Sequence, residues 1–273
     1  MMKNKFWQLL GGAALAVAAT GAMADWTFNN TNTSTEASTG VKATASAYYI
    51  ANNGSGSAFV STTGKVVSAD TSLTYNNSSG LGVSSAKETG SPNHAVDNQT
   101  RTDMVLFSFT GLVELDYVSL GWTSNSSGSS TASNRDADFS VLRYTKTELP
   151  AGKDAKTPYT IVGKTWDTLM AEGWALVNDV DGKNAATYAV NGQGSNATKD
   201  SGLVSSWWIV SAFNTGFGGK SGLSNGNDYF KLASLKGTVH TPSSEVPEPS
   251  SLALLGLAAL GLAASRRRAK SRN

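Results

Sequence analysis

Acidic and amide side chains gather before or at the start of three stretches of the chain that have the composition of β-strands. Oxygen atoms on neighbouring loops are the ligands that Ca²⁺ prefers, and the ion takes about six to eight of them. Asp and Asn also make turns before strands without any ligand, which is the simpler interpretation, and no segment has the spacing of an EF-hand loop. The candidate calcium ligands are Asp97, Asp103, Asp136, Asp138 and Asp228, with Asn98, Asn225 and Asn227 beside them.

Other catalytic arrangements have weaker support in the sequence. His94 and His240 lie far apart and lack metal-ligand spacing, so we interpret them as surface or structural residues. Residues 222–226 match Gly-x-Ser-x-Gly, but they lie in a loop rich in Gly, Asn and Ser and not at a strand-to-helix turn, so no nucleophile elbow is expected. Glu114, Asp116 and Glu172 could supply the two acids that glycoside hydrolysis requires, but no spacing marks them. We therefore expect no catalytic residues and no enzymatic activity, with a secreted hydrolase as the weakest alternative.

Composition excludes further classes of protein. The chain has 273 residues, 22 Lys+Arg, 20 Asp+Glu and no Cys. Without Cys there are no disulfides, no thiolate catalysis and no lipid attachment at a signal-peptide cysteine. Several basic residues sit at the two ends of the chain, and the part between them is slightly acidic. We therefore expect no nucleic-acid partner.

The first 24 residues have the three parts of a removable signal peptide. A short basic start is followed by an apolar run over residues 9–19, which is too short for a permanent membrane span. Ala22 and Ala24 are small residues at the positions that signal peptidase reads, so we expect cleavage before Asp25. The sequence thus predicts a signal helix, signal peptidase as a partner, and export.

The last 31 residues, 243–273, form a second processing segment. Its prolines keep the chain extended, and the apolar run over 252–264 predicts a short helix that spans a membrane only marginally. The basic end over 266–272 stays cytoplasmic by the positive-inside rule, which leaves the body outside. The extended motif is Val246, Pro247, Glu248 and Pro249, and the basic stop is Arg266, Arg267 and Arg268.

This succession of a Pro-flanked Glu, a short apolar helix and an arginine cluster resembles the PEP-CTERM sorting signal of Gram-negative bacteria. The resemblance implies processing by exosortase, a membrane-embedded cysteine transpeptidase that cuts near the motif. It further implies a transient inner-membrane anchor, after which the protein reaches the cell surface or the extracellular matrix. A plain tail-anchored protein would have the same topology but would keep its tail.

The body over 25–242 predicts a mainly β fold, a jelly-roll-like β-sandwich with one short helix. Short candidate strands such as 47–50, 58–60 and 73–75 alternate with turn-forming Asn, Gly and Ser clusters. Residues 104–109 are apolar on both faces, which is typical of a strand buried on both sides. We expect Gly111 to turn the chain into a return strand over 113–122.

Local patterns add three details. The alternation of 113–122 changes phase near Asp116, which indicates a β-bulge. Apolar residues at 166, 169 and 170 share one helical face that Gly173 can close. Strands are further expected over 138–144, 174–177, 207–213 and 229–235, and the adjacent Trp207 and Trp208 must face opposite sides of theirs.

Several short pieces of the body are similar to a group of exosortase-dependent surface proteins with one β-rich domain and no established enzymatic activity. The resemblance implies a non-catalytic surface or matrix protein associated with exopolysaccharide or biofilm. A carbohydrate-binding module that depends on Ca²⁺ is the main alternative. The pieces are 97–98, 103–109, 120–122, 136–142, 207–210 and 228–232.

Overall fold

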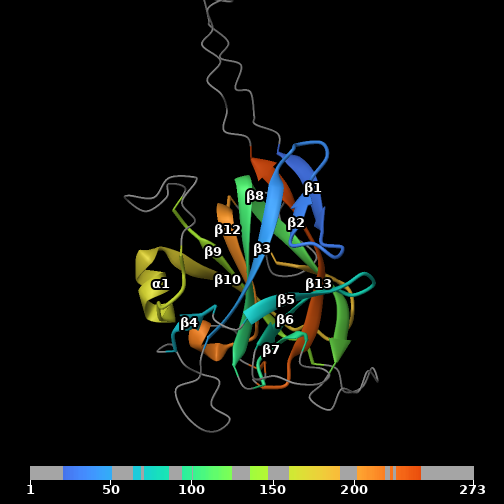
Figure 1. Ribbon diagram of the computed structural model, residues 1–273. Coiled ribbons are helices and arrows are strands. Elements are labelled where there is room, and N and C mark those ends of the chain that lie inside the picture. Colours follow the sequence, from blue (N-terminus) through green and yellow to red (C-terminus); the bar gives the residue numbers. More distant parts are fainter. Residues whose placement is uncertain are drawn as a thin grey trace, which may run out of the picture. The chain divides into compact units, whose positions relative to one another are not determined.

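The protein is built from antiparallel β-strands, to which one α-helix is added within the part of the chain that the structure describes (Figure 1). Figure 1 shows a computed structural model, which describes residues 21–50, 64–68, 71–85, 94–99, 101–124, 136–146, 160–190, 202–218, 222–223 and 226–240. The mainly β class is confirmed. The predicted signal helix, the strand over 58–60 and the C-terminal helix over 252–264 lie outside these residues. Within them, no helix is long and apolar enough to cross a membrane.

The elements follow one another along the chain in an order that is almost entirely strands. The helix is α1 (Trp166–Glu172), and a 3-10 turn, η2, spans Thr215–Phe217. The strands are β1 (Ala22–Thr27), β2 (Thr33–Thr35), β3 (Lys42–Ile50), β4 (Val66–Val67), β5 (Thr71–Asn76), β6 (Gly80–Ser85), β7 (Val96–Asp97), β8 (Thr102–Ser124), β9 (Phe139–Tyr144), β10 (Trp174–Val180), β11 (Thr187–Ala189), β12 (Val204–Ala212) and β13 (Tyr229–His240).

Strand β8 is continuous over 23 residues, so the predicted turn at Gly111 is wrong. Its first part pairs with β3 and its second part with β13, and the two parts do not pair with each other. Gly111 is not among the residues with a left-handed φ. A Cβ there would lie 3.1 Å from Val41 Cγ2, so the missing side chain makes room for packing and does not serve a turn.

All the strands within the described residues belong to one hydrogen-bonded sheet, in place of the two separate sheets of a jelly-roll sandwich. Its central order is β10-β9-β12-β8-β13-β6-β5, with β3 also on β8 and β1 also on β13. The sheet folds over itself, and the main apolar core fills the space between its two layers. Ring contacts cross this space, with centroids 4.8 Å apart for Trp26 and Phe109 and 5.8 Å apart for Phe139 and Phe230.

A second apolar cluster lies on the other face of the layer formed by β8, β9 and β12. Met104 and Leu106 contribute to this cluster, whereas Val105 and Phe107 lie in the main core, as the alternation along a strand requires. Helix α1 covers the second cluster with Trp166. The expectation of a strand buried on both faces is therefore confirmed.

The predicted helix is confirmed together with its ends. The Thr165 side chain accepts a hydrogen bond from the Thr168 amide, and Gly173 closes the helix with a left-handed φ of 116°. Met170 is 44% exposed, so the buried face is narrower than the spacing predicts and consists of Trp166 and Leu169.

The predicted bulge is also confirmed. Lys236 of β13 pairs with Tyr117 and the next residue, Gly237, pairs with Leu115, so Asp116 is the extra residue on β8. A Cβ on Gly237 would lie 2.3 Å from the Glu114 carbonyl oxygen, which explains why a glycine stands opposite the bulge.

Candidate cation site at an acidic junction

Three of the five predicted calcium ligands lie together. Ligand atoms of Asp136, Asp138 and Asp228 are within 4.8 Å of one another. Asp138 directly precedes β9 and Asp228 directly precedes β13, and backbone hydrogen bonds bring the two strand starts to one place. The Tyr229 amide donates to the Asp136 carbonyl over 3.2 Å, and the Phe213 amide donates to the Asp138 carbonyl over 3.0 Å. We call these three carboxylates the acidic junction.

Asp228 links two segments at the centre of the acidic junction. Its Oδ1 accepts a hydrogen bond from the Asp138 amide over 2.7 Å, and its Oδ2 accepts one from the Asn98 side-chain amide. Asn98 Oδ1 in turn accepts from the Asp228 amide over 3.0 Å, and Asn98 Nδ2 also donates to the Phe213 carbonyl over 2.9 Å. Asp228 and Asn98 are fully buried, so these bonds replace the water that both side chains lose on folding.

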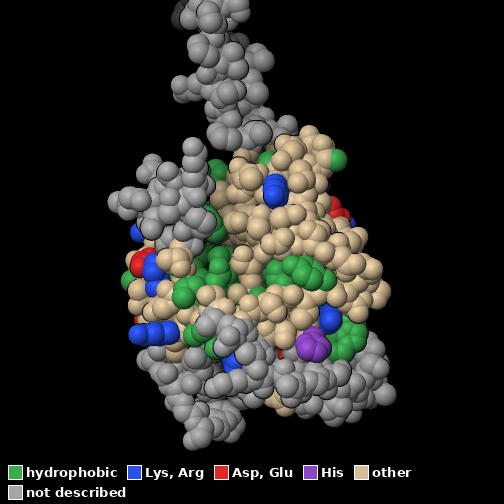
Figure 2. Space-filling view, viewed as in Figure 1, with side chains coloured by type: hydrophobic (Ala, Val, Ile, Leu, Met, Phe, Trp, Pro, Cys, Tyr) green, Lys and Arg blue, Asp and Glu red, His purple; other side chains and the backbone are tan. Residues whose placement is uncertain are grey.

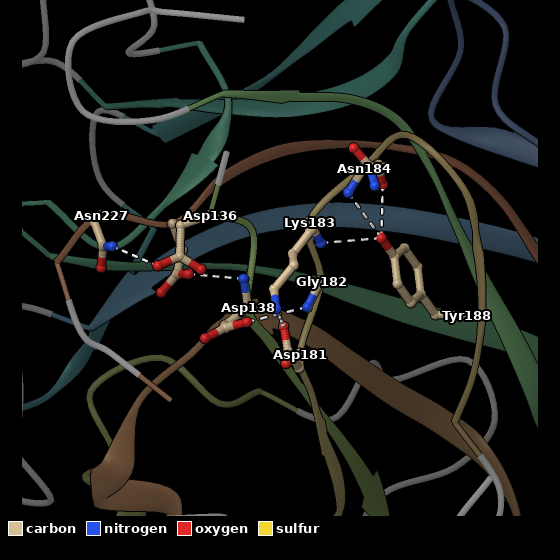
Figure 3. Close-up of polar contacts among 9 residues, drawn as sticks. Asp136, Asp138, Asp181, Gly182, Lys183, Asn184, Tyr188 and Asn227 are labelled. Carbon is tan, nitrogen blue, oxygen red and sulfur yellow. Dashed lines mark hydrogen bonds and ion pairs between the residues drawn. The ribbon is translucent and has the colours of Figure 1, made fainter. Parts of the chain in front are cut away.

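The other two carboxylates have their own donors, as Figure 3 shows. Asp138 Oδ1 accepts from the Gly182 amide over 3.0 Å, and Asp136 Oδ2 accepts from Asn227 Nδ2 over 2.5 Å. Gly182 follows β10, and a Cβ on it would lie 2.3 Å from the Ala137 carbonyl oxygen. The turn after β10 can therefore approach the acidic junction only because residue 182 is a glycine.

Burial and charge together raise the pKa of the Asp228 carboxyl well above its ordinary value. The largest cause is the loss of water around the side chain, followed by the negative charges of Asp138 and Asp136. The hydrogen bonds from the Asp138 amide and Asn98 lower the pKa and only partly offset these effects. Three carboxylates so close together favour either a bound proton or a bound cation, and hard oxygen ligands suit Ca²⁺.

Asp97 and Asp103 do not belong to the acidic junction. Asp97 Oδ1 accepts from the Gln99 amide over 3.0 Å, which is the turn-forming role of an aspartate. Asp103 lies inside β8 opposite Tyr49 and is fully buried. The sequence predicted calcium ligands before several strands, but it did not separate the residues before strands that converge from those that do not, and calcium binding stays a prediction.

Sequence reasoning missed the pairing of a buried carboxylate with a histidine. Glu114 is buried in β8, and its Oε2 lies 3.2 Å from His240 Nε2 at the end of β13. The pair follows from the register in which Thr238 lies opposite Glu114. The other proposed hydrolytic acids are engaged elsewhere: Asp116 Oδ2 accepts from Thr238 over 3.0 Å, and Glu172 pairs with Lys164 over 2.6 Å.

The residues of the predicted signal-peptidase site lie within β1. Ala22 pairs with Val239 and Ala24 pairs with Gly237, and the Ala24 side chain is only 4% exposed. Asp25, the predicted first residue of the mature protein, forms an ion pair of 3.0 Å with Lys236. Cleavage before Asp25 stays a prediction.

A comparison with family models decides the identity of the C-terminal segment. Residues 245–268 match the PEP-CTERM protein-sorting motif. The chain carries a PEP-CTERM motif. The match spans the predicted motif at 246–249, the apolar run over 252–264 and the three arginines at 266–268, and these PEP-CTERM residues lie outside the described part of the structure.

The PEP-CTERM motif implies an exported protein that passes through a membrane-bound stage and is processed by exosortase on its way to the cell surface. A search of curated proteins found no match to the chain. The PEP-CTERM assignment therefore concerns sorting, and the role of the β-rich body has to be argued from its own residues.

Proposed function

We propose that this protein is a non-catalytic component of the surface or extracellular matrix of a Gram-negative bacterium, associated with exopolysaccharide or biofilm. The PEP-CTERM motif carries the proposal, because it directs the body out of the cell. Signal peptidase removes the first 24 residues, and exosortase then removes the tail. The mature protein is the β-rich body.

The surface of the body supports this proposal. On the described part of the face seen in Figure 2, neutral polar side chains and backbone cover the largest area, hydrophobic side chains gather near the middle, and charged side chains are few. Only 15% of the residues are charged, whereas Ser, Thr, Asn and Gly are abundant. Hydroxyl and amide groups form hydrogen bonds with sugar hydroxyls without requiring a charged partner. Such a surface suits a hydrated polysaccharide matrix, and the described residues on this face form no large basic patch that would suit a nucleic acid.

The sorting step is tested by intact mass and fractionation in the native host, with and without exosortase. We expect the wild-type protein to lose both ends and to leave the inner membrane only when exosortase is present. The variant with Pro247→Ala and Glu248→Ala should remain in the inner membrane with its tail. The matched control, Ser243→Ala with Ser244→Ala, lies just before the motif and should be sorted normally.

A tail that persists in the wild type regardless of exosortase would make this a tail-anchored periplasmic protein and would remove the matrix proposal. The polysaccharide association has its own test, in a host strain that cannot make exopolysaccharide. There the processed protein should move from the matrix fraction into the medium. Unchanged retention in that strain would contradict the association.

A calcium-dependent carbohydrate-binding module is the second candidate, and the acidic junction favours it. Bound Ca²⁺ would neutralise the three carboxylates, whereas without it the burial of Asp228 and then the charges of Asp138 and Asp136 raise the pKa of Asp228. The ion would also fix the two loops that start β9 and β13, which could present a sugar-binding surface at that end of the body.

The calcium candidate predicts that Ca²⁺ raises the melting temperature of the wild-type protein relative to a chelator. At a concentration of about 100 times Kd, the ion should stabilise the fold by about 2.7 kcal/mol. Asp136→Asn with Asp138→Asn keeps an acceptor oxygen for Gly182 and Asn227 but removes two charges, so it should abolish this gain. Asp167→Asn, in the first turn of α1, is the matched control. Equal melting temperatures of the wild-type protein in calcium and in chelator would rule out the calcium-dependent carbohydrate-binding module.

A further inference from the structure

The predicted signal-peptidase bond, Ala24–Asp25, lies in the middle of a paired strand. All six residues of β1 are in register with β13, from Ala22 opposite Val239 to Thr27 opposite Ser234. The two strands therefore hold the bond on both sides, with three paired residues before it and three after it.

Side-chain packing holds this segment in place as firmly as the backbone ladder does. Ala24 is 4% exposed and belongs to the main core, and Trp26 is fully buried with its Nε1 donating to the Val41 carbonyl over 2.9 Å. Signal peptidase reads small side chains at the positions of Ala22 and Ala24, so both must leave the sheet to enter its active site. Cleavage of the folded chain thus requires β1 to open from β13 and Trp26 to leave the core.

The order of the chain adds a time dependence. Among the described elements, β1 forms its backbone ladder with β13 alone, and β13 is the last strand in sequence. While the chain is still crossing the membrane, β13 has not emerged and the bond in β1 has no ladder partner. Once β13 arrives, pairing can proceed.

We propose that the pairing of β1 with β13 closes the signal-peptidase site, so that folding of the body ends the period in which the signal peptide can be removed. This inference rests on the proposed export and on cleavage before Asp25. A chain that folds before it is cut keeps its signal peptide. A chain that is cut first keeps only Asp25–Thr27 of β1 in the ladder.

Purified signal peptidase in detergent micelles tests the inference on three substrates. They are the folded full-length chain, a peptide of residues 1–30, and a chain that ends at residue 228 and lacks β13. We expect the peptide and the shortened chain to be cut after Ala24 at similar rates. The folded chain should be cut at least about tenfold more slowly. A free-energy cost of only about 1.4 kcal/mol for opening β1 from β13 already gives that factor.

Two further arms make the outcome decisive. The full-length chain added directly from urea should be cut quickly at first and then become resistant as it folds. Lys236→Ala removes the exposed ion pair with Asp25 but leaves the ladder, so this full-length variant should remain as resistant as the wild type. Equal rates for the peptide and the folded wild-type chain would overturn the inference. A peptide that is not cut after Ala24 would overturn the cleavage site as well, while leaving the sorting motif intact.

Discussion

Replacing Trp208 with alanine is expected to destabilise the body by about 3–5 kcal/mol, since large aromatic side chains in a core lose that much on truncation. The Trp208 side chain is fully buried between the two layers of the folded sheet. Its Nε1 donates to the carbonyls of Val113 and Ser205, each over 3.2 Å, so the substitution leaves a cavity and takes a donor from two carbonyl oxygens. Urea unfolding followed by circular dichroism measures the loss.

Trp207→Ala is the matched control, because it removes the same side chain one residue earlier on the same strand. Trp207 faces the second cluster and is only partly buried, so we expect less than half the loss seen for Trp208. For a body of this size, each kcal/mol lowers the melting temperature by about 2–4 °C, so thermal unfolding also resolves the difference. Equal losses for the two variants would contradict the placement of Trp208 between the layers.

Local periodicity allowed the parts of the fold that depend on neighbouring residues to be predicted. The helix over 166–172 was predictable because its apolar residues recur at helical spacing and Gly173 follows them. The bulge at Asp116 was predictable because the alternation of β8 changes phase there. In both cases the signal and the structural feature lie within a few residues of each other.

Gly111 shows where a local signal misleads. Glycine is common in turns, but the inward-facing residues of β8 keep a two-residue period through this position, from Phe109 to Val113. The period indicates a strand that continues, and it outweighs the turn preference of one glycine. Which strands pair with each part of β8 is a long-range property that no local pattern contains.

Some residues fit two different roles, and a local pattern does not distinguish them. Ala22 and Ala24 fit a signal-peptidase site, and the same small residues fit a strand against β13. Glu114 and His240 are 126 residues apart, so their contact depends entirely on the register of β8 and β13. The acidic junction has the same origin, because strand starts that are distant in sequence meet at one end of the body.

Asp228→Ala is expected to destabilise the body by about 2–4 kcal/mol at a pH near 4. Under this condition most of the Asp228 carboxyl groups carry their proton in the folded state, since burial raises their pKa. The substitution removes the acceptor of the Asp138 amide and of the Asn98 side chain, and buried groups left without a partner lose about 1–3 kcal/mol each. Urea unfolding in the presence of a chelator measures the loss.

The loss caused by Asp228→Ala should become smaller as the pH rises, which separates the charge of Asp228 from its hydrogen bonds. A carboxyl group with a raised folded-state pKa stays protonated in the folded chain after it has ionised in the unfolded chain. The folded state then holds the extra proton, so the wild-type stability falls by up to about 1.4 kcal/mol per pH unit from the ordinary Asp pKa upward, until Asp228 also ionises in the folded state. The Asp228→Ala variant lacks this slope.

Glu36 changes stability in the opposite direction and only at lower pH, because backbone hydrogen bonds from Ser38 and Thr39 lower its pKa to about 2. Measurements above about pH 5 therefore exclude the contribution of Glu36, and Glu36→Gln should keep the wild-type slope there. A wild-type stability that rises over this range in chelator would contradict a protonated Asp228, and a slope that disappears when Ca²⁺ is added would show that the ion takes the place of the proton.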